Sequence, residues 1–543
     1  MKHVKKLASL LLAMVMVLAM STAAFAANVT LPTDDLLKNH TFVAYQIFTG
    51  DEANGTLSNV KWGNGIESAA FLNDLKSSTD EDLKILDTSK DAEPGTKVNA
   101  FAKCTTAADV ADVLGKNNSN DALAKAFARI AFDHKKGPGI TLSSGDNTLS
   151  DGYYLIVDTT DVSGDQDKVQ NAALLQVVGD DVTIGVKTDK PTLDKQIKHN
   201  ETNTWGVVGD NQIGDTVEFR TITTVPNTTY YETYTYTITD TMSAGLTSNV
   251  KTAGDLKILV NDDETKQLST DYYRVDVDSK NSNKFKLTID IKKAVADGKM
   301  KAGDKLYTNY SGVLNENAEI YSNGKEDNKA CLIYSNEPNG DGTGKTPEKV
   351  VYDWTFKMGI NKVDSKGKEL TGAKFVLSEK GGLNIADLEL NADGVPANTT
   401  DLIALIANSD GTYTVAPAGY TGNTTYVIDA GNTTIKGLDD ETDYYLYETK
   451  APAGYNLRTT PVKFRIAAEY RTDGSALKEN YPTVTVDSGT PTTTLSADVV
   501  NQAGSTLPET GGMGTTLFYI IGSLMVAVAA VLLIVKRRMS VER

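Results

Sequence analysis

The fold of this chain is decided by the stretch Thr216-Val217-Glu218-Phe219-Arg220-Thr221-Ile222-Thr223-Thr224-Val225, in which apolar and polar side chains alternate. Such alternation turns one row of side chains toward a core and the other toward solvent, which predicts a half-buried β-strand. A second strand, rich in Tyr and Thr, is predicted over residues 230–238. The composition agrees, because the chain has 24 Tyr against 3 Trp, and Tyr and Thr favour strands.

The same pattern continues toward both ends of the chain. Further strands are predicted over residues 41–48, 152–157, 173–178, 182–186, 354–363 and 495–501. A helical pattern over residues 107–132 is broken at Gly115-Lys116-Asn117-Asn118, and a short helix is predicted over residues 290–296 with Asp290 as its N-cap. The predicted fold class is mainly β, with three tandem immunoglobulin-like β-sandwiches, the first containing some helix.

The two ends of the chain carry targeting signals. Residues 1–26 combine three lysines, an apolar core and Ala24-Phe25-Ala26, which is typical of a cleaved secretory signal peptide. Near the other end, Leu507-Pro508-Glu509-Thr510-Gly511 precedes an uncharged apolar run of 19 residues, 517–535. Such a run is long enough to cross a bilayer, and the basic tail, residues 536–543, would hold its end in the cytoplasm.

Three domains are predicted between these signals, over residues 27–187, 188–347 and 348–505. The Gly-rich stretch Asn339–Thr346 is interpreted as a linker between the second and the third. It is not a phosphate-binding loop, because Asn339 stands where the GxxxxGK[ST] spacing requires the first Gly.

Charge and metal-binding residue types exclude several functions. The formal charge of −17 would become −23 after loss of the signal peptide and the tail, each of which removes three net positive charges. So acidic a chain is not expected to bind nucleic acid. The four histidines are scattered, so neither a metal nor a cofactor is predicted. The two cysteines, Cys104 and Cys331, are predicted to be buried free thiols rather than a disulfide.

The C-terminal motif resembles the LPxTG sorting signal of Gram-positive wall proteins. The resemblance implies that a sortase cleaves between Thr510 and Gly511 and joins the new Thr510 carboxyl to an amine. The run from Tyr444 to Tyr455 reads YYLYETKAPAGY and resembles the E-box of Gram-positive backbone pilins, in domains of the collagen-adhesin B type. In that family a lysine on the first strand and an asparagine on the last form an intramolecular isopeptide bond, which here implies Lys362 and Asn501.

The chemistry of such a bond can be stated from the residue types. A lysine attacks an amide only when it is neutral, and burial lowers its pKa by disfavouring the charged form. The amide carbonyl must be polarised, and a buried carboxylic acid can donate the necessary hydrogen bond and move protons as ammonia leaves. Glu448, inside the E-box run, is the candidate for this role.

A second set lies in the second domain. Lys195 is on its first strand, and Asp240 lies in a run resembling the acidic motif of the second domain of backbone pilins. The acceptor is Asn328 or Asn336. Each cross-link would close a loop of more than 130 residues and, treated like a disulfide, would stabilise by roughly 4–5 kcal/mol. It would also let tension bypass the hydrogen bonds of the sheets.

The resemblance covers nearly the whole chain and implies a shaft-forming pilin. The lysine that receives the next subunit would be Lys187, in Ile184-Gly185-Val186-Lys187, although Tyr and Pro of the family's VYPK-like run are missing; Lys190 is the alternative. The protein would be a sortase substrate and not an enzyme, apart from one turnover of self-cross-linking. Implied partners are sortase, identical subunits, minor pilins, peptidoglycan and host or extracellular-matrix ligands. The alternative is a wall-anchored adhesin or minor pilin that does not polymerise through its own lysine.

Overall fold

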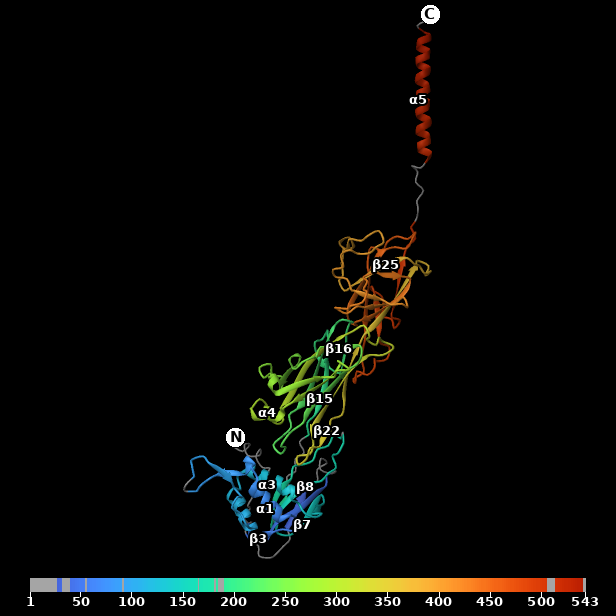
Figure 1. The fold of residues 1–543 in the computed structure, drawn as a ribbon. Helices are drawn as coiled ribbons and strands as arrows, with labels where there is room; N and C mark the ends of the chain where they lie inside the picture. Colours follow the sequence, from blue (N-terminus) through green and yellow to red (C-terminus); the bar gives the residue numbers. More distant parts are fainter. Residues whose placement is uncertain are drawn as a thin grey trace, which may run out of the picture.

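The computed structural model describes residues 27–31, 40–53, 56–89, 92–164, 166–179, 182–183, 190–504 and 513–540. Its strands form three units that follow one another along an elongated molecule, and helix α5 (Met513–Met539) stands apart at the far end (Figure 1). We call residues 27–183 the first unit, residues 190–354 the second unit and residues 356–504 the third unit. The mainly β fold expected from the sequence is confirmed.

The first unit combines sheets with helices. One sheet has the order β3-β2-β8-β9, with β6 paired to β2, and a smaller one has the order β10-β1-β7. The predicted helical region is two helices that end and restart around the Gly115–Asn118 break. The elements are β1 (Ala27–Leu31), β2 (Phe42–Ala53), β3 (Thr56–Trp62), α1 (Ser68–Ser77), β4 (Lys84–Leu86), β5 (Lys97–Asn99), α2 (Ala107–Lys116), α3 (Asp121–Asp133), β6 (Ile140–Leu142), β7 (Gly145–Leu149), β8 (Gly152–Asp158), β9 (Leu174–Val178) and β10 (Val182–Thr183).

The second unit is a sandwich of two sheets, ordered β12-β11-β14-β20-β16 and β13-β23-β21-β15-β19-β18. Along β14 every second side chain is buried, as its alternating sequence predicts. The elements are β11 (Leu193–Lys198), β12 (Trp205–Gly206), β13 (Val208–Asp210), β14 (Thr216–Thr224), β15 (Tyr236–Met242), β16 (Leu246–Ser248), β17 (Lys257–Val260), β18 (Tyr273–Val277), β19 (Lys284–Ile289), α4 (Ile291–Ala296), β20 (Lys305–Leu314), β21 (Glu326–Ser335), β22 (Thr343–Lys345) and β23 (Lys349–Trp354).

The third unit is a second sandwich, with sheets ordered β26-β27-β29-β24-β33 and β28-β25-β30-β31-β32. Its first and last strands, β24 and β33, lie side by side and are parallel. The elements are β24 (Phe356–Asp364), β25 (Ala373–Ser378), β26 (Leu405–Ala407), β27 (Tyr413–Val415), β28 (Ile428–Ala430), β29 (Asn432–Leu438), β30 (Asp443–Lys450), β31 (Val462–Ala467), β32 (Thr483–Val486) and β33 (Ser496–Asn501). Short 3-10 helices lie at Glu81–Leu83, Ala253–Asp255, Thr270–Tyr272 and Ile385–Leu388.

Three sequence predictions differ from the structure. The strand predicted over residues 230–238 begins only at Tyr236. The tyrosines before it make other contacts: the rings of Tyr231 and Tyr234 meet edge to face, and Lys125 Nζ of the first unit lies 5.0 Å from the centre of the Tyr230 ring. The predicted linker Asn339–Thr346 contains β22, which pairs with β21. Strand β23 also pairs with β21, so the second unit continues beyond the predicted boundary at residue 347.

Candidate functional site

Lys362, Glu448 and Asn501 meet in the core of the third unit. In the parallel pair β24 and β33, Lys362 lies opposite Val499, so its side chain reaches forward to Asn501. Lys362 Nζ donates hydrogen bonds to the Val499 carbonyl oxygen at 2.8 Å and to Asn501 Oδ1. The structure thus brings the predicted amine into direct contact with the predicted amide.

Glu448 reaches the same place from the opposite sheet, on β30. Its Oε2 accepts hydrogen bonds from Asn501 Nδ2 at 2.9 Å and from the backbone N–H of Arg458 at 2.7 Å. Its Oε1 lies 3.8 Å from Lys362 Nζ. A carboxyl group in this position contacts both the nitrogen that would leave and the nitrogen that would attack.

Burial sets the electrostatics of this site. The side chains of Lys362 and Glu448 have no exposed surface, and Asn501 is 2% exposed. Burial lowers the pKa of Lys362 below its ordinary value, although the nearby Glu448 carboxylate acts in the opposite direction. A lowered pKa increases the fraction of neutral amine, which is the form able to attack a carbonyl carbon.

Lys195 and Asp240 meet in the core of the second unit in a related arrangement. Lys195 lies on β11 in one sheet and Asp240 on β15 in the other. Lys195 Nζ donates a hydrogen bond of 2.6 Å to Asp240 Oδ2, and neither side chain has exposed surface. Burial lowers the pKa of Lys195 and raises the pKa of Asp240, which favours the neutral forms of both groups.

Tyr310 on β20 is a member of this site that the sequence reasoning missed. Lys195 Nζ donates a hydrogen bond to its hydroxyl, which in turn donates one to Asp240 Oδ2. The ring is held by Phe219 and Phe285, whose centroids lie 5.9 and 5.4 Å away. Tyr310 is one of several tyrosines at buried positions of alternating strands, so no sequence pattern distinguished it.

The two candidate acceptors in the second unit lie in different places. Asn328 pairs across from Met242 on the neighbouring strand, and its Nδ2 lies 3.5 Å from the Tyr310 hydroxyl. Asn336 lies past the end of β21, and its Nδ2 donates to the Val162 carbonyl of the first unit at 3.0 Å. Asn328 therefore faces the Lys195 site, whereas Asn336 joins two units.

Several predicted sites lie outside the described residues: the signal peptide, Lys187, and the sorting motif with Leu507, Pro508, Glu509, Thr510 and Gly511. Lys190 is described, and its Nζ forms an ion pair of 2.8 Å with Asp167. Within the predicted anchor, Leu517–Met539 is long and apolar enough to cross a membrane, with a mean hydropathy of 2.7, and none of it is buried.

The first unit has a buried polar network of a different kind. His40 Nδ1 lies 2.7 Å from Asp158 Oδ2, which also accepts from Asn171 Nδ2 at 2.8 Å. Among the residues that the structure describes, the buried lysines are Lys195 and Lys362, so this unit shows no comparable lysine site. Both cysteines are free and buried, as predicted.

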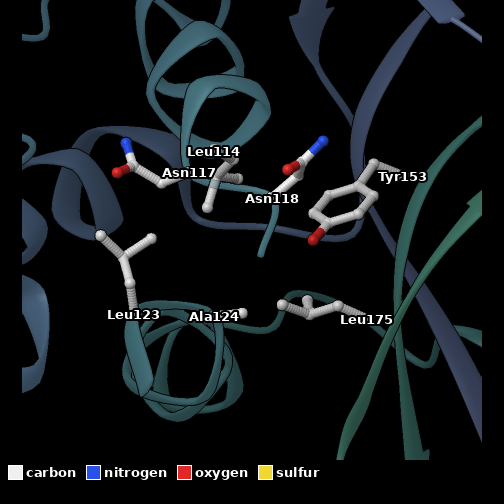
Figure 2. Close-up of a pocket in the computed structure, with 7 residues that line it drawn as sticks. All are labelled: Leu114, Asn117, Asn118, Leu123, Ala124, Tyr153 and Leu175. Carbon is white, nitrogen blue, oxygen red and sulfur yellow. The ribbon is translucent and has the colours of Figure 1, made fainter. Parts of the chain in front are cut away.

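A small cavity lies between the helices and the sheet of the first unit (Figure 2). Its volume of about 20 Å³ has room for about one water molecule. It is too small for a substrate of an enzyme. Its lining residues are Leu114, Asn117, Asn118, Leu123, Ala124, Tyr153 and Leu175.

Comparison with known families identifies two parts of the chain. Residues 356–480 match the SpaA family, described as a prealbumin-like fold domain, and residues 499–540 match the LPXTG cell wall anchor motif. The chain is 30% identical over 266 residues to the trypsin-resistant surface T6 protein of Streptococcus pyogenes serotype M6, across 42% of this chain and 48% of that protein. It is 39% identical over 106 residues to the fimbrial subunit type 1 of Actinomyces viscosus, across 20% of this chain and 17% of that protein.

These matches identify a prealbumin-like domain and a wall-anchor motif in the chain, and the curated relatives are a surface protein and a fimbrial subunit. The chain spans about half or less of the length of the curated relatives it matches. Among solved structures it resembles the T6 backbone pilin of Streptococcus pyogenes, with a TM-score of 0.45, 16% identity and coverage of 90% of this chain and 100% of that chain. It also resembles the major pilin SpaD of Corynebacterium diphtheriae, with a TM-score of 0.43, 16% identity and coverage of 89% and 98%. The wall-anchor match and helix α5 place the protein at the cell surface, held in the membrane before anchoring to the wall.

Proposed function

We propose that this protein is a pilin, the shaft subunit of a covalent pilus in which Thr510 of one subunit is joined to Lys187 of the next. The observation that carries the proposal is the wall-anchor match over residues 499–540 in a chain whose curated relatives include a fimbrial subunit. A sortase would cleave after Thr510 and transfer its acyl group to the lysine amine, with Gly511 leaving on its own amine. Head-to-tail joining of this kind produces an open fibre.

We further propose that Lys362–Asn501 and Lys195–Asn328 become isopeptide bonds. In each case the lysine nitrogen would attack the carboxamide carbon, the acid would hand a proton to the departing nitrogen, and ammonia would leave. Glu448 and Asp240 would be the acids. The buried contacts of Lys362 with Asn501 and of Lys195 with Asp240 support this chemistry. The protein would then be a structural subunit that reacts once with itself, not an enzyme that turns over substrate.

The proposed partners follow from this role. They are sortase, further copies of this chain, minor pilins and peptidoglycan, with host or extracellular-matrix ligands as the targets of adhesion. Lys190 is a weaker candidate for the receiving amine than Lys187, because its ammonium is paired with Asp167.

The polymer can be tested in the native host on denaturing gels of wall extracts. Lys187→Ala should abolish the high-mass ladder while the monomer stays anchored to the wall, and Lys190→Ala should leave the ladder intact. A Thr510→Ala control should lose both the ladder and wall anchoring. A ladder that persists in Lys187→Ala would contradict the assignment of Lys187, and wild-type protein without a ladder would favour a wall-anchored adhesin or minor pilin.

A further inference from the structure

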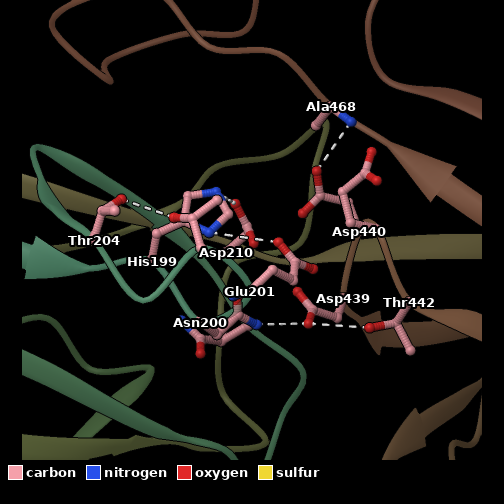
Figure 3. A network of polar contacts seen from close by, with 12 residues as sticks. His199, Asn200, Glu201, Thr204, Asp210, Asp439, Asp440, Thr442 and Ala468 are labelled. Atoms are coloured by element: carbon pink, nitrogen blue, oxygen red, sulfur yellow. Dashed lines mark hydrogen bonds and ion pairs between the residues drawn. The ribbon is translucent and has the colours of Figure 1, made fainter.

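Four carboxylates from two units meet at the junction between the second and third sandwiches. Glu201 lies in the turn after β11, Asp210 ends β13, and Asp439 and Asp440 directly follow β29. One carboxylate oxygen from each of the four lies within 4.8 Å of those of the others. Figure 3 shows the four side chains turned toward one another from both sides of the junction.

The buried members of this cluster have oxygens without hydrogen-bond donors. Asp210 is 0% exposed and Asp439 is 5% exposed, and Oδ1 of each has no partner among the described residues. Their other oxygens are bound: Tyr470 donates to Asp210 Oδ2 at 3.0 Å, and Asn200 Nδ2 donates to Asp439 Oδ2 at 2.7 Å. Two buried acceptor oxygens of the cluster are thus left without a hydrogen-bond donor, and an unpaired buried polar atom costs free energy.

Little positive charge is available to balance these carboxylates. His199 Nε2 lies 3.4 Å from Asp210 Oδ2, and the nearby Arg465 is paired with Glu441 at 2.6 Å. The sandwiches therefore hold a group of acids close together in a place that, without a cation, disfavours their charge.

We propose that Glu201, Asp210, Asp439 and Asp440 bind one calcium ion that joins the second unit to the third. Calcium takes oxygen ligands, carboxylates above all, at about 2.3–2.6 Å, and carboxylate oxygens within 4.8 Å of one another are close enough to contact one such ion together. The Glu201 side chain is 30% exposed and gives the ion access from solvent. The scattered histidines of the sequence predict no metal site, whereas these ligands are carboxylates from segments that are distant in the sequence.

The inference does not depend on polymerisation, so it can be tested on soluble, monomeric ectodomain. The protein used is residues 27–510, because Leu517–Met539 has no buried part and adds nothing to the cores of the described units. After treatment with a chelator it is titrated with terbium, a luminescent stand-in for calcium, with excitation through tyrosine. Tyr470 contacts both Asp210 and Asp440 and is positioned to sensitise the ion. We expect saturable luminescence with one ion per chain, displaced by calcium, and a rise in the unfolding temperature on adding calcium alone.

The variant D439N/D440N should lose at least tenfold in calcium affinity and show no calcium-dependent rise in unfolding temperature. The matched control is Asp429→Asn, an exposed aspartate of the same unit that is paired with Lys374, and it should bind calcium like wild type. Glu201→Gln, at the exposed edge, provides a second test if the double variant fails to fold. Absence of saturable calcium binding, unchanged binding in Glu201→Gln and D439N/D440N, or binding of zinc alone through His199 would each overturn the proposal.

Discussion

The hydroxyl of Tyr310 contacts both Lys195 Nζ and Asp240 Oδ2 in the core of the second unit. It also lies 3.5 Å from Asn328 Nδ2, so one hydroxyl is adjacent to the proposed nucleophile, acid and leaving group. The site in the third unit differs, because Glu448 contacts Asn501 directly and Lys362 donates straight to the amide oxygen. The two proposed cross-links should therefore differ in how they respond to substitution of a single side chain.

Tyr310→Phe should slow or prevent the Lys195–Asn328 bond and leave the Lys362–Asn501 bond unaffected, because the hydroxyl relay is lost only in the second unit. Intact mass measures this directly, since each isopeptide removes one ammonia, about 17 Da. Wild-type ectodomain should be about 34 Da lighter than its sequence, and the variant about 17 Da lighter than its own. Tyr307→Phe, on the same strand but opposite Ile222, is the control. A full deficit in Tyr310→Phe, formed at the wild-type rate, would remove Tyr310 from the reaction.

Glu448→Gln should abolish the Lys362–Asn501 bond, because an amide cannot serve as the acid that shuttles the proton. The open chain should lose about 5 kcal/mol in the free energy of unfolding, the order expected for a closed loop of 139 residues. Urea unfolding of the third unit, combined with intact mass, checks both effects. Glu469→Gln, an exposed position paired with Lys478, should change neither quantity. A cross-link that still forms in Glu448→Gln would show that Glu448 is not the acid.

Asn328→Ala and Asn336→Ala should have opposite consequences. Asn328→Ala should prevent the Lys195–Asn328 bond, so that only one ammonia is lost from the intact mass, and should leave the contact between the first and second units unchanged. Asn336→Ala should keep both ammonia losses but weaken that contact, because its amide donates to Val162 across the joint. Limited proteolysis near residues 184–189 reports the joint, and intact mass reports the bond. If the Asn328→Ala protein still lost two ammonia molecules, Asn328 would not be the acceptor of the Lys195 bond.

Asp109→Asn should destabilise the first unit in a pH-dependent way. Hydrogen bonds from Thr105, and then from Thr106, lower the pKa of Asp109 to about 2 from an ordinary value of 3.8. Because the folded pKa is the lower one, Asp109 stabilises the fold above its ordinary pKa, and this contribution is lost as pH falls from about 4 to about 2. The difference in the free energy of unfolding between wild type and variant should therefore shrink over that pH range. Unfolding monitored by the far-UV circular dichroism of the helices measures this difference.

The sequence predicted site residues that lie in recognisable local motifs, but not those that are brought together only by the packing of distant segments. Lys362 and Asn501 could be located from their motif contexts, and most of the strands and helices that the sequence predicted lie within a few residues of the observed ones. Tyr310 could not be found, because its role depends on which buried face of β20 opposes Lys195. The junction carboxylates could not be found either, because Glu201 and Asp439 are separated by more than two hundred residues and meet only when two sandwiches dock. The boundary at residue 347 failed because Gly-rich composition does not exclude a short edge strand such as β22.

A single residue, Thr355, separates strand β23 of the second unit from strand β24 of the third. Its hydroxyl donates to the Leu438 carbonyl, and the neighbouring Trp354 donates through Nε1 to the Gly474 carbonyl. Because the connection is short and bound by hydrogen bonds, we expect the two sandwiches to bend little against each other and to act as one rod. A filament built from such rods would bend mainly where one subunit meets the next, and its persistence length would be governed by those seams.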